Sequence, residues 1–162
     1  MDSGTKLSKF DEGENIDSTF FKGLVGSLRY LTYTRTYIFF VVGVVSRFME
    51  ASTSTHLKVT RRILRYLKGT IDFGLFYSSS SNFNLMGFCD SDYVGDIDGR
   101  KSTTGFVFFL GDSVISWSSK KQSIVTLSTC EAEYIGATSC TSHAIWMRRL
   151  LKELNLSQIE AT

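Results

Sequence analysis

The sequence predicts an α+β fold, in which a helical segment precedes a small antiparallel sheet and one long helix. The prediction rests on two changes of hydrophobic period. Up to about residue 70, apolar residues recur at the helical spacings of three and four. From residue 71 to 117 they form short strand-like runs, and after residue 117 the helical spacing returns. With 162 residues, 43% of them hydrophobic and 21% charged, the chain has the composition of an ordinary globular protein.

Three helices are expected before residue 70. The first covers 20–31, and the second covers 38–49, where length favours a helix although β-branched residues are frequent. Ser54 or Thr55 is expected to cap the third helix, which reaches about Leu67 and ends at Lys68-Gly69.

The third expected helix carries a cationic face. Its basic residues fall at positions i, i+3, i+4, i+7 and i+10, which is one side of a helix: Lys58, Arg61, Arg62, Arg65 and Lys68. A stripe of this kind could contact a phosphate backbone, whereas the alternative is the solvated outer face of an amphipathic helix. No acidic residue occurs between His56 and Thr70, and this absence favours phosphate contact.

Short strands are expected after residue 71. The candidates are 73–77, 83–90, 105–110 and 114–117. The last two flank Gly111-Asp112-Ser113, a turn that suits a hairpin, while the serine-rich run 78–81 and the polar segment 91–102 are expected to be loops. Together these runs predict an antiparallel meander of three or four strands.

The last expected helix begins at a capping box formed by Ser128 and Glu131. Behind the box, the following residues form a continuous apolar stripe: Ala132, Ile135, Gly136, Cys140, His143, Met147, Leu150, Leu151 and Leu154. Because Glu131 is engaged at the helix start, Glu133 is free to face Asp90, which ends the apolar run 85–90.

Asp90 and Glu133 are the candidate catalytic and metal-binding residues. Carboxylate oxygens are ligands that Mg²⁺ prefers, and two ions about 4 Å apart can clamp the attacking and leaving oxygens of a phosphodiester. For these two residues alone, a structural role in capping or ion pairing is an equal alternative. The neighbouring acids Asp92, Asp96 and Asp98 lack the ligand pattern of a calcium loop, so turn chemistry is the preferred interpretation.

Composition narrows the remaining classes of function. A net charge of +2 is too small to indicate nucleic-acid binding by itself. Three cysteines without C-x-x-C spacing (Cys89, Cys130 and Cys140) are typical of a reduced, intracellular protein. The N-terminus lacks the apolar core of a signal peptide, and the longest apolar run is far shorter than the roughly 20 residues that span a bilayer. We therefore expect a protein of the cytoplasm or nucleus without membrane contact.

Ordered motifs extend over nearly the whole chain. They are LVGSLRYL (24–31), SRFM (46–49), RYLKGT (65–70), DSDY (90–93), RKSTTG (100–105), WSSKKQ (117–122) and STCEAEY (128–134). In these motifs the chain resembles the C-terminal part of plant copia-type retrotransposon polyproteins, from the end of the reverse transcriptase into the ribonuclease H domain.

The resemblance implies three parts: a polar tail or linker (1–17), the helical end of a reverse transcriptase (18–70) and a truncated ribonuclease H-like domain (71–162). In that family, carboxylates on the first strand and the first helix bind Mg²⁺ for cleaving RNA in an RNA–DNA hybrid, and Asp90 and Glu133 match these positions. The basic stripe could contact the hybrid. Polymerase activity is not expected, because the catalytic palm is absent.

The family continues with a strand that ends in a third catalytic Asp, which this chain does not include. We therefore expect poor Mg²⁺ affinity and no useful nuclease activity from the chain alone. The strand of Asp90 would also keep an exposed edge, which favours self-association. Val94 stands where the family usually has Ala, and Ser or Thr replaces several usual prolines, a pattern expected of a decaying copy.

Two alternatives stay open. Arg62-Ile63-Leu64-Arg65 fits the Arg-x-Leu-Arg tetrapeptide of secreted effectors that act in plant cells, although helix periodicity explains it better. A non-catalytic nucleic-acid-binding module that uses Lys58 to Lys68 is the other alternative.

Overall fold

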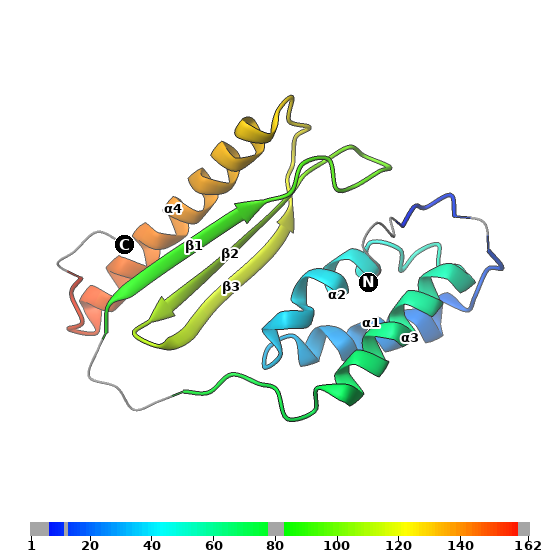
Figure 1. Ribbon diagram of the computed structural model, residues 1–162, viewed down its shortest axis with the longest axis horizontal. Coiled ribbons are helices and arrows are strands. Elements are labelled where there is room, and N and C mark those ends of the chain that lie inside the picture. Colours follow the sequence, from blue (N-terminus) through cyan, green and yellow to red (C-terminus); the bar gives the residue numbers. More distant parts are fainter. Residues whose placement is uncertain (1–6, 12, 78–82, 159–162) are drawn as a thin grey trace. The chain divides into compact units, whose positions relative to one another are not determined.

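The computed structural model describes residues 7–11, 13–77 and 83–158, and the chain forms two compact units (Figure 1). The first unit comprises 1–74 and 96–98, and the second comprises 75–95 and 99–162. The described residues form four α-helices and a three-stranded antiparallel sheet, so the predicted α+β class is confirmed. The serine-rich run 78–81 lies outside the described residues.

The first unit is helical. Its elements are α1 (Ser18–Leu31), the 3₁₀-helix η1 (Thr36–Ile38), α2 (Phe39–Ser46) and α3 (Ser54–Gly69). The three helices predicted from apolar periodicity are therefore present, with the second one shorter than expected. The side chain of Asp17 caps α1 by accepting the backbone N–H of Thr19 at 2.9 Å.

The cap of α3 is Thr53, rather than either of the two residues after it. His56 completes a capping box with Thr53, and its Nδ1 accepts the backbone N–H of Thr53 at 3.1 Å. This bond leaves the ring proton on Nε2, which lies 3.1 Å from the carbonyl oxygen of Ser8. The buried imidazole also stacks on Phe48, with ring centroids 4.2 Å apart. His56 is therefore a structural residue, not a metal ligand.

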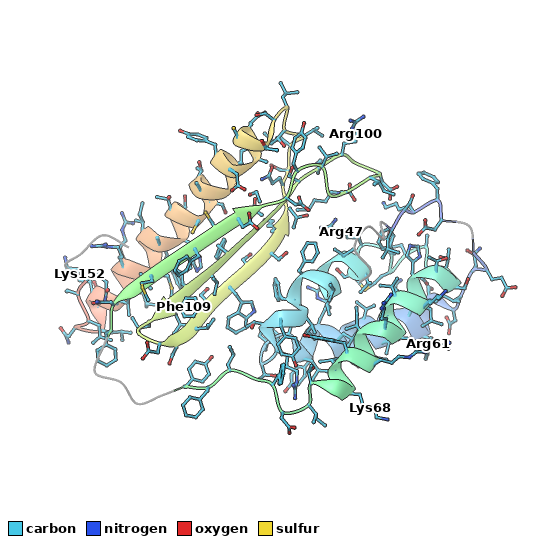
Figure 2. The ribbon with its side chains drawn as sticks, viewed as in Figure 1. Arg47, Arg61, Lys68, Arg100, Phe109 and Lys152 are labelled. Atoms are coloured by element: carbon cyan, nitrogen blue, oxygen red, sulfur yellow. The ribbon has the colours of Figure 1, made fainter. Side chains whose placement is uncertain are left out.

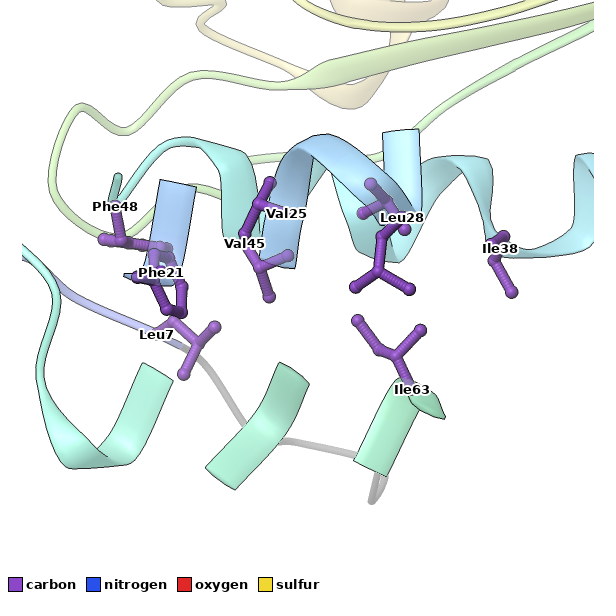
Figure 3. Close-up of a cluster of buried hydrophobic side chains, with 9 residues drawn as sticks. Leu7, Phe21, Val25, Leu28, Ile38, Val45, Phe48 and Ile63 are labelled. Carbon is purple, nitrogen blue, oxygen red and sulfur yellow. The ribbon is translucent and has the colours of Figure 1, made fainter. Parts of the chain in front are cut away.

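A single apolar cluster lies between these helices (Figure 3). Its buried members are Leu7, Phe21, Val25, Leu28, Ile38, Val42, Val45, Phe48 and Ile63. The segment expected to be a polar tail contributes Leu7 to this cluster, and the backbone N–H of Ile16 donates to the carbonyl oxygen of Ser52 at 3.1 Å. The described part of residues 1–17 therefore packs on the helices.

Residues 73–77 do not form the strand that their composition predicts. The guanidinium of Arg35 donates to the carbonyl oxygens of Thr70, Ile71 and Phe73 at 3.0, 2.8 and 2.5 Å. These carbonyls follow the C-terminal end of α3, where a cation is favoured by the helix dipole. Arg35 thus holds the turn that follows α3, and residues 73–77 after this turn pair with no strand.

The second unit contains β1 (Leu85–Ser91), β2 (Thr103–Leu110), β3 (Ser113–Lys121) and α4 (Thr129–Glu153). The strands pair antiparallel in the order β1-β2-β3, which confirms the predicted meander, and β3 is longer than expected. Gly111 and Asp112 make the turn between β2 and β3, and Gly111 adopts a φ of 57° there. Phe108 pairs with Ser116 and Phe109 pairs with Val114, so Ile115 between them is an extra residue that forms a β-bulge in β3.

Helix α4 packs along β1 and β2 and covers one face of the sheet (Figure 1). The buried cluster beneath it contains Leu85, Phe108, Cys140, Met147 and Leu151. His143 of α4 packs against Phe106 and Phe108, and its Nε2 lies 3.0 Å from Ser116 Oγ, so the side chain has a hydrogen-bond partner as predicted, but it is half-buried rather than part of the buried core.

Two residues of the predicted apolar stripe, Leu150 and Leu154, are exposed instead of buried. Leu154 lies beyond the end of α4 at Glu153, and Leu150 lies about 100° around the helix from the buried Leu151, at the margin of the face that meets the sheet. The stripe is therefore narrower than the sequence indicates.

Replacing Val94 by Gly should stabilise the second unit. Val94 has a φ of 53°, a left-handed conformation that costs a non-glycine residue about 1–2 kcal/mol. We expect Val94→Gly to raise the free energy of unfolding by about 1 kcal/mol. Urea unfolding followed by tryptophan fluorescence reports on this unit, because both tryptophans, Trp117 and Trp146, lie in it.

Val125→Gly is the matched control. Val125 is exposed and has no positive φ, so glycine there should lower stability by adding freedom to the unfolded chain. The backbone N–H of Val94, which donates to Ser102 Oγ at 3.2 Å, is retained in both variants. Equal losses of stability in the two variants would contradict the strain assigned to Val94.

Candidate functional site

The second unit brings Glu133 to the end of β1, beside Asp90. Oε1 of Glu133 accepts the backbone N–H of Ser91 at 3.3 Å, and Ser91 directly follows Asp90. The next N–H, that of Asp92, donates to Thr103 on β2 at 3.0 Å. Because successive N–H groups of a strand point in opposite directions, Glu133 lies at the edge of β1 that faces away from β2. Both candidate carboxylates are exposed.

The start of α4 is fixed over the end of the sheet by small and polar residues. Gly136 lies against Ser91 and Thr104, where an added Cβ would clash with Ser91 Oγ and stand 3.2 Å from Thr104 Cγ2. Nε2 of the buried Gln122 donates to Thr104 Oγ1 at 2.8 Å and to the carbonyl oxygen of Ala132 at 2.9 Å. These contacts, rather than any property of Glu133 itself, place its carboxylate next to β1.

The capping box also behaves as predicted, with one difference. Ser128 Oγ accepts the backbone N–H of Glu131 at 3.1 Å. The carboxylate of Glu131 accepts the N–H of Leu127 at 2.6 Å, one residue before the cap instead of at the cap itself. Glu131 is thus engaged at the helix start, which leaves Glu133 as the acid that reaches the strand.

The other acids of the 90–98 segment have structural partners. Asp92 Oδ1 accepts the backbone N–H of Thr103, Asp96 lies 3.7 Å from Arg47 Nη1, and Asp98 accepts hydrogen bonds from Ser8 Oγ at 2.6 Å and from the backbone N–H of Lys9 at 2.8 Å. These acids therefore make long-range contacts instead of the predicted local turn contacts, and they give no support to a calcium loop.

Asp90 and Glu133 supply the ligand class that Mg²⁺ takes, but only part of a ligand set. In the described ranges, no group of three or more His, Cys, Asp or Glu side chains could hold a metal ion. Two exposed carboxylates are a weak site for an ion that favours near-octahedral oxygen coordination. The two carboxylates therefore have the donor type that Mg²⁺ takes but do not complete a magnesium site.

The cationic face forms on α3 as the spacing predicts. All five of its basic side chains are exposed, and Arg61 and Lys68 are labelled along the helix in Figure 2. The opposite side of α3 carries the buried residues His56, Thr60 and Ile63. The helix thus separates its charge from its core contacts, as a surface for phosphate groups requires.

Two cysteines meet where β1 and α4 pack together. The buried thiol of Cys140 shares a hydrogen bond with the thiol of Cys89, and no cysteine is in a disulfide. Burial raises the pKa of Cys140 to about 11, with smaller contributions from the charge and the hydrogen bond of Cys89. Cys130, in the first turn of α4, is exposed.

Three features of the sites were missed by sequence reasoning. They are the N–H of Ser91 as the partner of Glu133, the amide of Gln122 as the anchor of α4, and an aromatic pocket of the first unit described below. Gln122 ends one of the ordered sequence motifs, which was the available signal.

In the described part of the chain, no helix has both the length and the apolar character needed to cross a bilayer.

Comparison with known proteins places the chain among transposon polyproteins. It is 41% identical over 156 residues to the retrovirus-related Pol polyprotein from transposon RE1 of Arabidopsis thaliana. It is 45% identical over 162 residues to the corresponding polyprotein from transposon TNT 1-94 of Nicotiana tabacum. Both matches cover 96% of this chain, but 11% and 12% of the two relatives, so the chain spans about a tenth of their length.

A shorter relative is Secreted RxLR effector protein 161 of Plasmopara viticola, which is 39% identical over 124 residues, or 76% of this chain and 87% of that protein. No protein-family profile and no solved structure matches the chain. The matches define a retrotransposon-derived sequence. The chain belongs to the family of retrovirus-related Pol polyproteins of plant transposons, which confirms the predicted resemblance.

The three cysteines should differ in reactivity at pH 8. A thiol reacts with iodoacetamide as the thiolate, so the raised pKa and burial of Cys140 should protect it, while the exposed Cys130 should be alkylated readily. The rate at Cys140 should increase as the pH rises toward about 11. Peptide mapping by mass spectrometry measures each site separately.

The same pKa has a consequence for stability. Because it lies above the unfolded value of 9.0, the neutral thiol favours the folded state below pH 9, and this contribution is lost as the pH rises through about 11. Alkylation in urea is the control, since all three cysteines should then react. Equal labelling of Cys140 and Cys130 in the folded protein at pH 8 would contradict the assignment.

Proposed function

We propose that this chain is a polyprotein fragment derived from a Mg²⁺-dependent nuclease that cleaves RNA in RNA–DNA hybrids. The observation that carries the proposal is the position of Glu133, whose carboxylate is held at the N–H of Ser91 beside Asp90. A strand-end carboxylate and a helix-start carboxylate would bind the metal, and Mg²⁺ would supply charge stabilisation at the phosphodiester. Membership of the Pol polyprotein family supports the same interpretation.

We further propose that the 162-residue chain by itself does not turn over a hybrid. Two carboxylates provide too little negative charge and too few oxygen ligands to hold the ions that in-line cleavage requires. Because both are exposed, water competes for any ion that binds between them. The pair is then a half-site, arranged for metal but incomplete.

Mg²⁺ titration should reveal this half-site without activity. In NMR spectra, we expect weak, saturable shifts of the amide resonances of Ser91 and Glu133, lost in both Asp90→Asn and Glu133→Gln. A hybrid-cleavage assay with Mg²⁺ or Mn²⁺ should show no turnover. Asp112→Asn is the control, since Asp112 is an exposed acid in the hairpin turn between β2 and β3.

Two results would count against these proposals. Turnover that disappears in Asp90→Asn would show a complete active site and overturn the proposed inactivity. Shifts that persist unchanged in both carboxylate variants would remove the half-site itself, because another group would then bind the ion.

The cationic face of α3 is proposed to contact the phosphates of the hybrid. Its five exposed basic residues occur on one side of the helix, and each phosphate contact would release condensed counterions. This role depends on the first unit only. It is therefore separable from the carboxylate pair of the second unit.

Removing Arg61 and Arg65 should weaken hybrid binding and its salt dependence together. If each contacts one phosphate, the slope of log K against log salt should fall in magnitude by about 1.8 in Arg61→Ala/Arg65→Ala, since each duplex contact contributes about 0.9. Fluorescence anisotropy over a salt series measures it. Lys22→Ala/Arg29→Ala removes two exposed charges from α1 and is the matched control. An equal change in both double variants would assign the effect to net charge alone.

A second candidate function comes from the relative named as a secreted effector. This chain contains the tetrapeptide Arg62-Ile63-Leu64-Arg65, but it lies inside α3 and Ile63 is buried in the core. A motif that must be read as an extended segment would be hidden there, so this candidate is the weaker one. Secretion of the protein into culture medium would favour it over the nuclease-derived fragment.

A further inference from the structure

The first unit contains a pocket of about 280 Å³ between α3 and the segment formed by η1 and α2. Its apolar lining comes from Ile38, Val41, Val59 and Ile63. Tyr37 and Tyr66 add two aromatic rings to the lining, and Arg62 of the cationic face adds a guanidinium. The volume lies just below the range for small-molecule sites, about 300–1,000 Å³, so it suits one ring system rather than a large ligand.

The aromatic part of the pocket is held in place. The rings of Tyr37 and Tyr66 meet edge to face, with centroids 5.7 Å apart and planes at 77°. The hydroxyl of Tyr37 accepts a hydrogen bond from Arg35 Nη1 at 2.9 Å and lies 3.2 Å from Thr70 Oγ1. Arg35 is itself fixed by the backbone carbonyls at the end of α3. Tyr37 is therefore a rigid wall against which a planar group can rest.

Tyr66 is the accessible ring of the pair. Its relative exposure is 51%, against 36% for Tyr37, so a ligand can reach it from solvent. It lies one turn after Arg62, which lines the same pocket, so the cationic face of α3 reaches the pocket. A planar apolar group that is attached to negative charge would satisfy the aromatic wall and the cations together.

We propose that this pocket receives an unpaired nucleobase of a strand whose phosphates contact the cationic face of α3. The inference rests on the proposed nucleic-acid contact and adds to it the recognition of a single-stranded region. Bases stack on aromatic side chains whatever their sequence, so the site would prefer single-stranded extensions without reading a particular base. An acidic peptide with an aromatic side chain is the other ligand with this chemistry, and the five exposed cations along α3 favour the repeating charge of a nucleic acid.

The test compares two fluorescent RNA–DNA hybrids by anisotropy, one blunt and one with a short single-stranded extension. The full chain should bind the extended hybrid more tightly, and an extension made of abasic nucleotides should lose the advantage. In Tyr66→Ala the affinity advantage of the extended hybrid should decrease by a factor of about 5 to 150, which is the usual effect of losing one stacked base. Tyr66→Phe should keep it, because the ring remains.

Tyr30→Ala is the matched control, because Tyr30 is an exposed tyrosine on α1 of the same unit and does not line the pocket. It should leave the advantage of the extended hybrid unchanged. Circular dichroism of each variant verifies that the helices are retained, and Tyr66→Phe preserves the test if Tyr66→Ala does not fold.

The outcomes separate this inference from the proposed function. Equal binding of the two hybrids by the unmodified chain would overturn the nucleobase pocket, while affinity for the blunt hybrid that falls in Arg61→Ala/Arg65→Ala would still support phosphate contact. Absence of binding to either hybrid would overturn both. A different outcome would assign the pocket to a peptide and overturn the inference. In that case a short acidic peptide containing tryptophan would displace the extended hybrid preferentially, and the abasic extension would bind as tightly as the normal one.

Discussion

The second unit depends on the buried amide of Gln122, which joins the sheet to the first turn of α4. The residue follows β3 directly, and its Nε2 bonds both to Thr104 on β2 and to the backbone of Ala132 on α4. Leaving such a group without partners in a buried position would cost about 1–3 kcal/mol, so the helix start and the strand ends are held in one arrangement. Gly136 makes that arrangement possible, because it lets α4 approach Ser91 and Thr104 closely.

Two chemical features of the second unit follow from this approach. Glu133 is the residue after Ala132, so fixing the backbone of Ala132 brings the carboxylate of Glu133 to Ser91 and next to Asp90. Further along the same contact, the thiols of Cys89 and Cys140 meet, and the burial that packing creates raises the pKa of Cys140. None of these contacts needs a metal ion.

The sequence predicts those parts of the fold that depend on local pattern. Apolar period was sufficient for α1 and α3, the capping box for the start of α4, the turn residues for the hairpin at Gly111, and the spacing of basic residues for the cationic face. Prediction from the sequence pattern failed where a residue distant in the chain decides the local structure. Residues 73–77 have the composition of a strand, but Arg35 binds the backbone at their start. The partner of Glu133 is a backbone N–H, and no residue pattern encodes the direction of a backbone group.

The two units therefore place their functional groups by different means. The proposed half-site requires three strands and a helix in register, because Glu133 reaches the N–H of Ser91, next to Asp90 in the chain, only through tertiary contacts. The cationic face requires one helix, and the pocket beside it requires that helix, its neighbour and the clamp formed by Arg35. Substitutions that disturb the sheet would abolish the proposed half-site and leave α3 intact. Loss of nuclease chemistry, as proposed for this chain, is for that reason compatible with retained contact to nucleic acid.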